Sequence, residues 1–132
     1  MLSVADEGVR EALQRAKYVS FSTLRRNGNW VDTPVWCAPD ADCLYIFSAG
    51  EAGKVKRLRN FAQCRLATCT FNGRLTGDWH TGKAWLIDDA EEAAVAHRAL
   101  LRKYGLQMRA ADFGARLSGR LQRRRYIGVR LD

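Results

Sequence analysis

The sequence has no hydrophobic run long enough to cross a membrane and no apolar leader segment. No stretch of its 132 residues approaches the roughly 18 apolar residues that a spanning helix requires. Charged side chains interrupt the N-terminal segment, whereas a signal peptide needs an unbroken apolar core there. These charged residues are Asp6, Glu7, Arg10, Glu11 and Arg15. We therefore expect a cytoplasmic protein with no membrane partner.

Cysteine and histidine are also too sparse to predict a metal site. None of the four cysteines forms a C-x-x-C pair, and the two histidines, His80 and His97, lie on different predicted elements. Cys64 directly precedes the predicted strand 65–71 and Cys69 lies within it, five residues on, so in extended chain their side chains point to opposite faces and cannot share an ion. We expect no bound metal and four reduced thiols buried in the core.

Positive charge is abundant. Lysine and arginine number 22 against 14 acidic residues, which gives a formal net charge of +8. Such a balance favours an anionic partner. That partner could be a nucleic acid, a membrane surface or a phosphorylated small molecule, and charge alone does not choose among them.

The periodicity of the sequence predicts a mainly β protein with peripheral helices in a single domain, residues 1–132. Alternating apolar and polar residues predict six short strands, and in so small a chain this number favours an antiparallel barrel, since closure removes exposed edges. The predicted strands are 18–24, 30–38, 43–48, 65–71, 79–87 and 126–131, and the predicted helices are 3–17, 54–61, 88–104 and 106–120.

Several residues mark the ends and irregularities of these elements. Asn27-Gly28 is a strong hairpin signal because both residues accept a positive φ. Pro34 inside a strand predicts an edge position or a bulge, and Gly82 predicts a bulge. The segment 39–42 reads as a turn. Helix caps are expected at Ser3, at Asp88 or Asp89 and, for the C-terminal end, at Gly105.

The strongest candidate site is the glycine-containing segment that leads into the short basic helix. Gly50 and Gly53 allow the backbone to approach a ligand closely, and the start of a helix attracts anions. Lys54 and Arg57 are three residues apart and share one helix face, where Arg57 can grip a phosphate bidentately. These features predict a phosphate cradle, with a solvated basic helix as the alternative. No nucleophile–base arrangement stands out, so the catalytic residues are unknown, and a cofactor that brings its own chemistry would explain their absence.

The order of several short motifs resembles that of the pyridoxamine 5′-phosphate oxidase-like, FMN-binding split β-barrel superfamily. The match is sharpest to its branch of deazaflavin (coenzyme F420)-dependent oxidoreductases. The motifs are YVSFSTLR at 18–25, NG at 27–28, TPVW at 33–36, LYIF at 44–47, GKVKRLRN at 53–60, GKA at 82–84 and RKYG at 102–105. The resemblance covers nearly the whole chain and implies a homodimer with a cofactor in each of two grooves between the subunits.

The resemblance also assigns residues to cofactor binding. The strand segment beside the ring system corresponds to Thr33, Pro34 and Val35. The region that holds the phosphate corresponds to Ser48, Lys54 and Arg57. A facing subunit would line the ring pocket with Trp79 and His80.

The implied function is that of an oxidoreductase that uses a reduced deazaflavin, or FMN, for hydride transfer to a small-molecule substrate. The alternative is a non-catalytic protein that binds FMN, haem or a tetrapyrrole. We do not expect nucleic-acid binding, because base stacking needs aromatic platforms and the arginine-rich segment 106–125 has only Phe113 and the adjoining Tyr126 nearby. That segment could instead reach the acidic tail of a deazaflavin or be solvated.

Overall fold

The computed structural model describes residues 4–50 and 52–132, so the expected cap Ser3 lies outside the described residues. Its strands are β1 (Tyr18–Leu24), β2 (Trp30–Val35), β3 (Cys37–Asp40), β4 (Cys43–Ala49), β5 (Gln63–Cys69), β6 (His80–Ile87) and β7 (Arg124–Leu131). Its helices are α1 (Val4–Arg15), α2 (Gly53–Leu58), α3 (Ala90–Tyr104) and α4 (Leu106–Leu117), with a 3-10 turn at Leu121–Arg123. The segment after Gly105 is therefore helical, as predicted.

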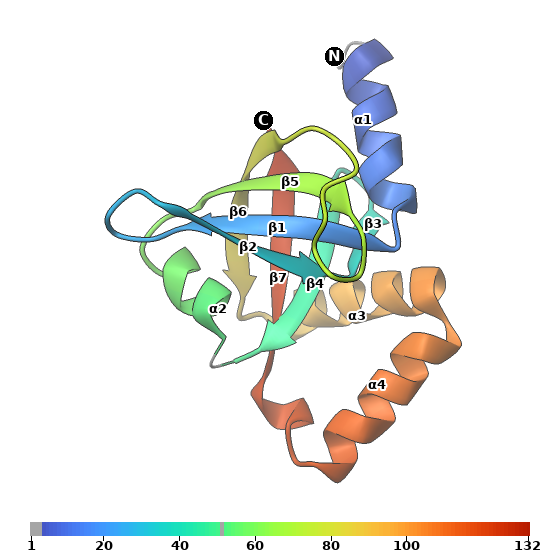
Figure 1. Ribbon diagram of the computed structural model, residues 1–132. Helices are drawn as coiled ribbons and strands as arrows, with labels where there is room; N and C mark the ends of the chain where they lie inside the picture. The colour runs from blue at the N-terminus through green and yellow to red at the C-terminus, as the bar shows by residue number, and fades with distance from the viewer. Residues whose placement is uncertain (1–3, 51) are drawn as a thin grey trace.

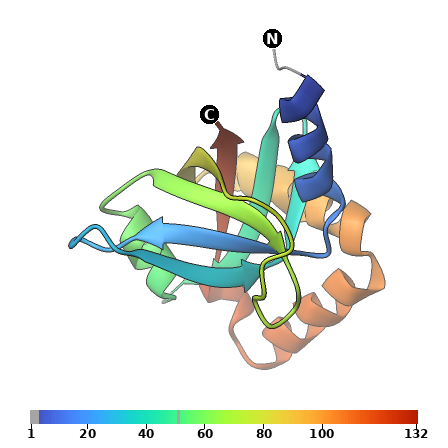
Figure 2. The same ribbon diagram turned by 45° about the horizontal axis from the view of Figure 1, so that its top comes forward.

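The strands form one antiparallel sheet that curls into a half-barrel, in the order β2-β1-β5-β6-β7-β4-β3 (Figure 1). The two parts of the sheet cross steeply, with β1, β2 and β5 in front of β4 and β7 (Figure 2). The prediction of a mainly β split barrel with helices is confirmed, but the sheet has seven strands rather than six.

The additional strand arises because the predicted strand 30–38 divides at Trp36. Residues before Trp36 pair with β1 at one edge of the sheet, and residues after it pair with β4 at the other edge. The barrel is therefore split between two strands that are consecutive in the chain. Pro34 lies on the edge strand β2, opposite Ser20, as the sequence predicted.

The barrel interior takes alternate residues from the strands, which is the period-two pattern of the sequence. Phe21, Leu66 and Ile127 are fully buried there, and Leu13 of α1 packs against the same cluster. A second cluster joins α3 to the outer side of the sheet, with Leu100 at its centre. Among the described residues, no helix is long and apolar enough to cross a bilayer.

The caps of α3 explain where this helix begins and ends. Asp89 accepts a hydrogen bond from the backbone N–H of Glu92 at 3.0 Å, so Asp89 is the N-cap. Glu92 does not complete the reciprocal capping box, because its carboxylate accepts a hydrogen bond from Trp85 Nε1 at 2.6 Å. Gly105, at a φ of 56°, ends the helix as predicted.

Three predicted irregularities differ from the structure. In the β1–β2 hairpin only Gly28 has a positive φ, because the hairpin closes through a longer loop in which Arg25 N–H donates to the Asn29 carbonyl. The turn before β4 lies at 41–42, since residues 39–40 belong to β3. Gly82 pairs regularly with Leu131 and forms no bulge; a Cβ there would lie 2.7 Å from a backbone carbonyl oxygen of β7.

Candidate cofactor-binding site

The short helix α2 presents two half-buried cations beside the end of β1. Arg57 Nε donates a hydrogen bond of 2.6 Å to Oγ1 of Thr23, a fully buried residue of β1. This bond fixes the guanidinium plane and leaves its two terminal nitrogens for a ligand. Lys54 lies one turn earlier in α2, so the two cations share one face of the helix, as the spacing predicted.

Gly53 leaves space for the Arg57 side chain. A Cβ added at Gly53 would lie 2.6 Å from Arg57 Nη1, closer than real Cβ atoms approach a neighbour. The absence of a side chain at this position therefore allows the guanidinium to lie against the backbone that starts α2. Gly50 is close to another backbone segment instead, because a Cβ there would lie 2.3 Å from the carbonyl oxygen of Arg123.

The electrostatics of this cluster favour an anion. Burial lowers the pKa of Lys54, and the neighbouring Arg57 lowers it further. Burial likewise lowers the pKa of Arg57, with a contribution from Arg25. Among the described residues, neither Lys54 nor Arg57 forms an ion pair. A bound phosphate would satisfy both cations and offset their mutual repulsion.

The cluster gains little from the start of the helix. α2 has only six residues and its cap residue, Ala52, makes no side-chain hydrogen bond. Ser48, at the end of β4, is buried and its hydroxyl donates to the carbonyl of Ala49 at 3.1 Å. The phosphate-binding capacity therefore resides in the side chains of Lys54 and Arg57, and these residues fit such a group.

The segment predicted to lie beside a ring system is on the edge strand at the split of the barrel. Val35 is buried, Thr33 is half-buried and Pro34 is exposed. Immediately after them, Trp36 stacks on the ring of Tyr104 with a centroid separation of 4.7 Å. The edge is thus followed directly by a stacked aromatic pair.

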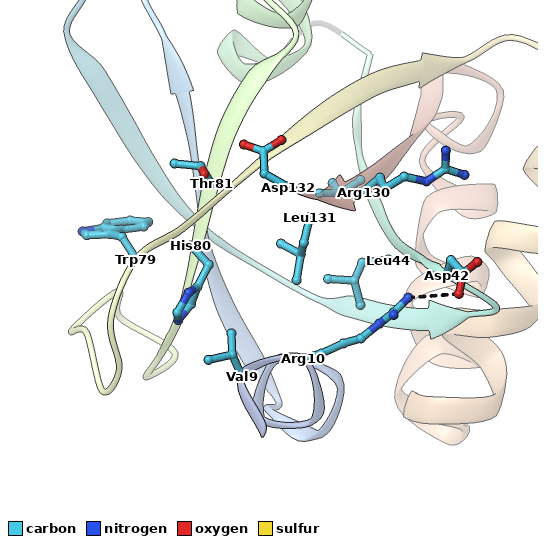
Figure 3. A pocket seen from close by; sticks show the side chains of 11 residues that line it. Val9, Arg10, Asp42, Leu44, Trp79, His80, Thr81, Arg130, Leu131 and Asp132 are labelled. Carbon is cyan, nitrogen blue, oxygen red and sulfur yellow. Dashed lines mark ion pairs between the residues drawn. The ribbon is translucent and has the colours of Figure 1, made fainter. Parts of the chain in front are cut away.

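Trp79 and His80 lie in a different place, at a pocket of about 900 Å³ between α1 and the ends of β4, β6 and β7 (Figure 3). The pocket has an apolar floor that includes Leu44 and Leu131, and the Arg10–Asp42 ion pair of 3.5 Å spans its far side. None of the six other predicted cofactor-binding residues lines this pocket. Within one chain, the eight residues therefore occupy three locations: α2 with the end of β4, the edge strand, and the pocket.

Several residues of these sites were not predicted from the sequence. Thr23, which orients Arg57, carries no motif of its own and is 34 positions away in the chain. Tyr104 accepts a hydrogen bond from the backbone N–H of Cys37 at 2.9 Å and donates one to the Lys17 carbonyl at 2.8 Å. It thereby attaches α3 to the split of the barrel, a role that no local pattern in the sequence indicated.

The four cysteines are free and buried, as predicted. His97 is not a plain surface residue, because its Nε2 lies 2.8 Å from Asp112 Oδ2. Asp112 also accepts a hydrogen bond of 2.6 Å from Arg124, whose side chain is only 6% exposed. Arg124 is therefore one arginine of the segment 106–125 that is not solvated.

Comparison with known proteins identifies the fold. No protein-family model matches the sequence, and no curated protein matches it. Among solved structures, a candidate 5-nitroimidazole antibiotic resistance protein from Bacteroides thetaiotaomicron is 16% identical, with a TM-score of 0.72 over 100% of this chain and 82% of that one.

Two further structures have the same fold. The heme storage protein HutZ from Vibrio cholerae is 10% identical, with a TM-score of 0.70 over 96% of this chain and 89% of that one. An FAD-binding protein from Mesorhizobium loti is 14% identical, with a TM-score of 0.66 over 99% of this chain and 91% of that one. This chain has the same fold as these three structures.

Proposed function

We propose that this protein is an oxidoreductase that holds FMN or the deazaflavin coenzyme F420 by its phosphate at α2. The observation that carries the proposal is the pair of cations, Lys54 and Arg57, that have no counter-ion among the described residues. Thr23 also orients Arg57 against Gly53, and any side chain at position 53 would displace the Arg57 guanidinium. A structural neighbour described as FAD-binding supports a flavin-type cofactor.

In this proposal each group of residues has a distinct task. Arg57 grips two phosphate oxygens with its terminal nitrogens, and Lys54 adds a point charge. The edge segment 33–35 lies beside the ring, where buried Val35 and the Trp36–Tyr104 pair exclude water from one side. When bound, such a cofactor supplies two-electron hydride transfer, so the protein need only position a small-molecule substrate.

The proposed homodimer accounts for the separate position of Trp79 and His80. In one chain these two residues line a pocket, and Lys54 and Arg57 do not line it. In a homodimer with a cofactor groove between the subunits, a second copy would bring its own pocket residues toward the ring.

The test is titration of the purified protein with FMN and, separately, with F420, followed by quenching of cofactor fluorescence. Each of Lys54→Ala and Arg57→Ala should weaken binding by about 1.5–3 kcal/mol, the range for a hydrogen bond to a charged group. Arg59→Ala is the matched control, because Arg59 is an exposed cation just after the same helix. Unchanged affinity in both cradle variants would refute the phosphate site, and binding of only one cofactor would assign the branch.

A second candidate function is haem or tetrapyrrole binding without catalysis. Its supporting observation is the pocket of about 900 Å³, which combines an apolar floor with the imidazole of His80. Imidazole is a common ligand of haem iron, and one structural neighbour is described as a heme storage protein. Haem titration followed by absorbance tests this candidate, since His80→Ala should abolish the spectral shift.

A further inference from the structure

Helix α4 carries an exposed apolar stripe on the side that faces away from the rest of the molecule. Leu106 is 83% exposed, Phe113 is 63% exposed and Leu117 is 73% exposed. These residues are spaced by seven and four positions, which places them within an arc of about 40° on a helix of 3.6 residues per turn. Large apolar side chains gathered and exposed in this way mark an interaction surface.

The rotation of α4 about its own axis is fixed by contacts on the opposite face. Met108 is fully buried in the cluster that joins α3 to the sheet. Asp112 binds Arg124 of β7 and His97 of α3 through its two carboxylate oxygens. Figure 1 shows α4 at the periphery of the molecule, beyond α3 as seen from the barrel. The stripe is therefore held outward and cannot turn into the core.

Positive charge borders the stripe. Arg109 and Arg116 are exposed and lie seven residues apart along one side of it, and exposed Arg120 and Arg123 follow the helix. Asp112 is the one acidic residue in the segment 106–125, and its charge is already offset by Arg124. We call the three apolar residues together with Arg109 and Arg116 the α4 patch.

We propose that the α4 patch docks flat on an anionic lipid surface. The apolar stripe would enter the boundary between headgroups and acyl chains, and the arginines would contact lipid phosphates, which is how basic amphipathic helices bind membranes. A second copy of this chain is a poorer occupant, because it would bring another surface with the same arginines and a formal net charge of +8 against this one. The expectation of no membrane partner depended on the absence of a spanning segment. A helix that lies on the membrane surface needs no such segment.

The test is flotation of the full chain with vesicles of phosphatidylcholine alone or mixed with phosphatidylglycerol. We expect binding only to the mixed vesicles and release at high salt. The double variants Phe113→Ser/Leu117→Ser and Arg109→Gln/Arg116→Gln should each reduce binding at least about tenfold. Phe71→Ser is the matched control, because Phe71 is 72% exposed on the β5–β6 loop and lies outside the patch.

Three outcomes would overturn the proposal. The first is equal binding to neutral and anionic vesicles, and the second is full binding by both double variants. The third is that the natural chain binds no vesicles but self-associates, and that Phe113→Ser/Leu117→Ser abolishes this self-association. The last outcome would make the stripe a contact between copies. Cofactor titration of the same variants keeps this result separate from the proposed enzymatic function, because no α4 patch residue lines the pocket and α4 lies apart from α2 (Figures 1 and 2).

Discussion

Replacing Gly53 by alanine tests whether the cradle at α2 depends on the position of Arg57. The added Cβ would lie 2.6 Å from Arg57 Nη1, whereas ordinary contacts begin at 3.4 Å. The guanidinium would therefore have to retreat by about 0.8 Å to reach an ordinary contact, the difference between these two distances. Its Nε hydrogen bond to Thr23 is already as short as 2.6 Å and would stretch or break with that movement.

The expected effect is on ligand affinity and not on folding. A misplaced guanidinium loses one hydrogen bond to a phosphate, which costs about 1.5–3 kcal/mol and weakens binding roughly 10- to 150-fold. Gly53 does not have a positive φ, and replacing such a glycine by alanine stabilises a protein by about 0.4–1 kcal/mol through the unfolded chain. We therefore expect Gly53→Ala to unfold at or above the temperature of the natural chain.

The assay is calorimetric titration with FMN or F420 of Gly53→Ala, Arg57→Ala and the double variant. If Gly53 acts through Arg57, the double variant binds no more weakly than Arg57→Ala alone, because coupled residues are not additive. Gly114→Ala in α4 is the control, since a Cβ there meets nothing within 4 Å. The coupling would be refuted if Gly53→Ala bound the cofactor as tightly as the natural chain. It would also be refuted if the loss of binding free energy in the double variant equalled the sum of the losses in the two single variants.

Three further predictions concern stability and reactivity. Gly128→Ala places a Cβ 2.3 Å from Trp85 Cζ2, so it should lower stability by about 1–3 kcal/mol; an unchanged thermal midpoint would contradict this. Burial alone would raise the pKa of Asp112, but hydrogen bonds, led by that from Arg124, lower it below 3.8. The stabilisation that ionised Asp112 provides is therefore present above that pH and is lost as the pH falls through the lowered pKa. In urea unfolding at a series of pH values, Asp112→Asn should lose less stability on acidification than the natural chain. An equal loss in both proteins would count against a stabilising Asp112–Arg124 pair. Burial raises the pKa of Cys37 to about 12, so this thiol should react with a disulfide reagent only after unfolding, and prompt labelling of the native protein would disprove its burial.

The sequence predicted those elements whose signals are local. The alternation of β1 and the capping of α3 by Asp89 each depend on a few neighbouring residues, and the structure confirms both. The division of the strand 30–38 was not predictable, because no glycine or turn residue marks Trp36. The division is stabilised from a distance by Tyr104, which binds the backbone of Cys37 across 67 positions of sequence.

The candidate site follows the same rule. Lys54 and Arg57 could be paired from their spacing because one helical turn joins them. The orientation of Arg57 depends on Thr23 and could not be read from the segment that contains Arg57. The separation of His80 from both cations results from the curl of the whole sheet, which no local pattern encodes.

The split of the barrel has a consequence for how copies of the chain meet one another. A split barrel retains two strand edges, β2 and β3, and an uncovered edge is a template on which another extended chain can polymerise. The chain has only two prolines, and one lies on each of these edges: Pro34 on β2 and Pro39 on β3. Because proline has no N–H to donate, each edge is interrupted where a foreign strand would have to continue its ladder. The sheet does not close on itself, and these two prolines thus protect its open edges against edge-to-edge aggregation.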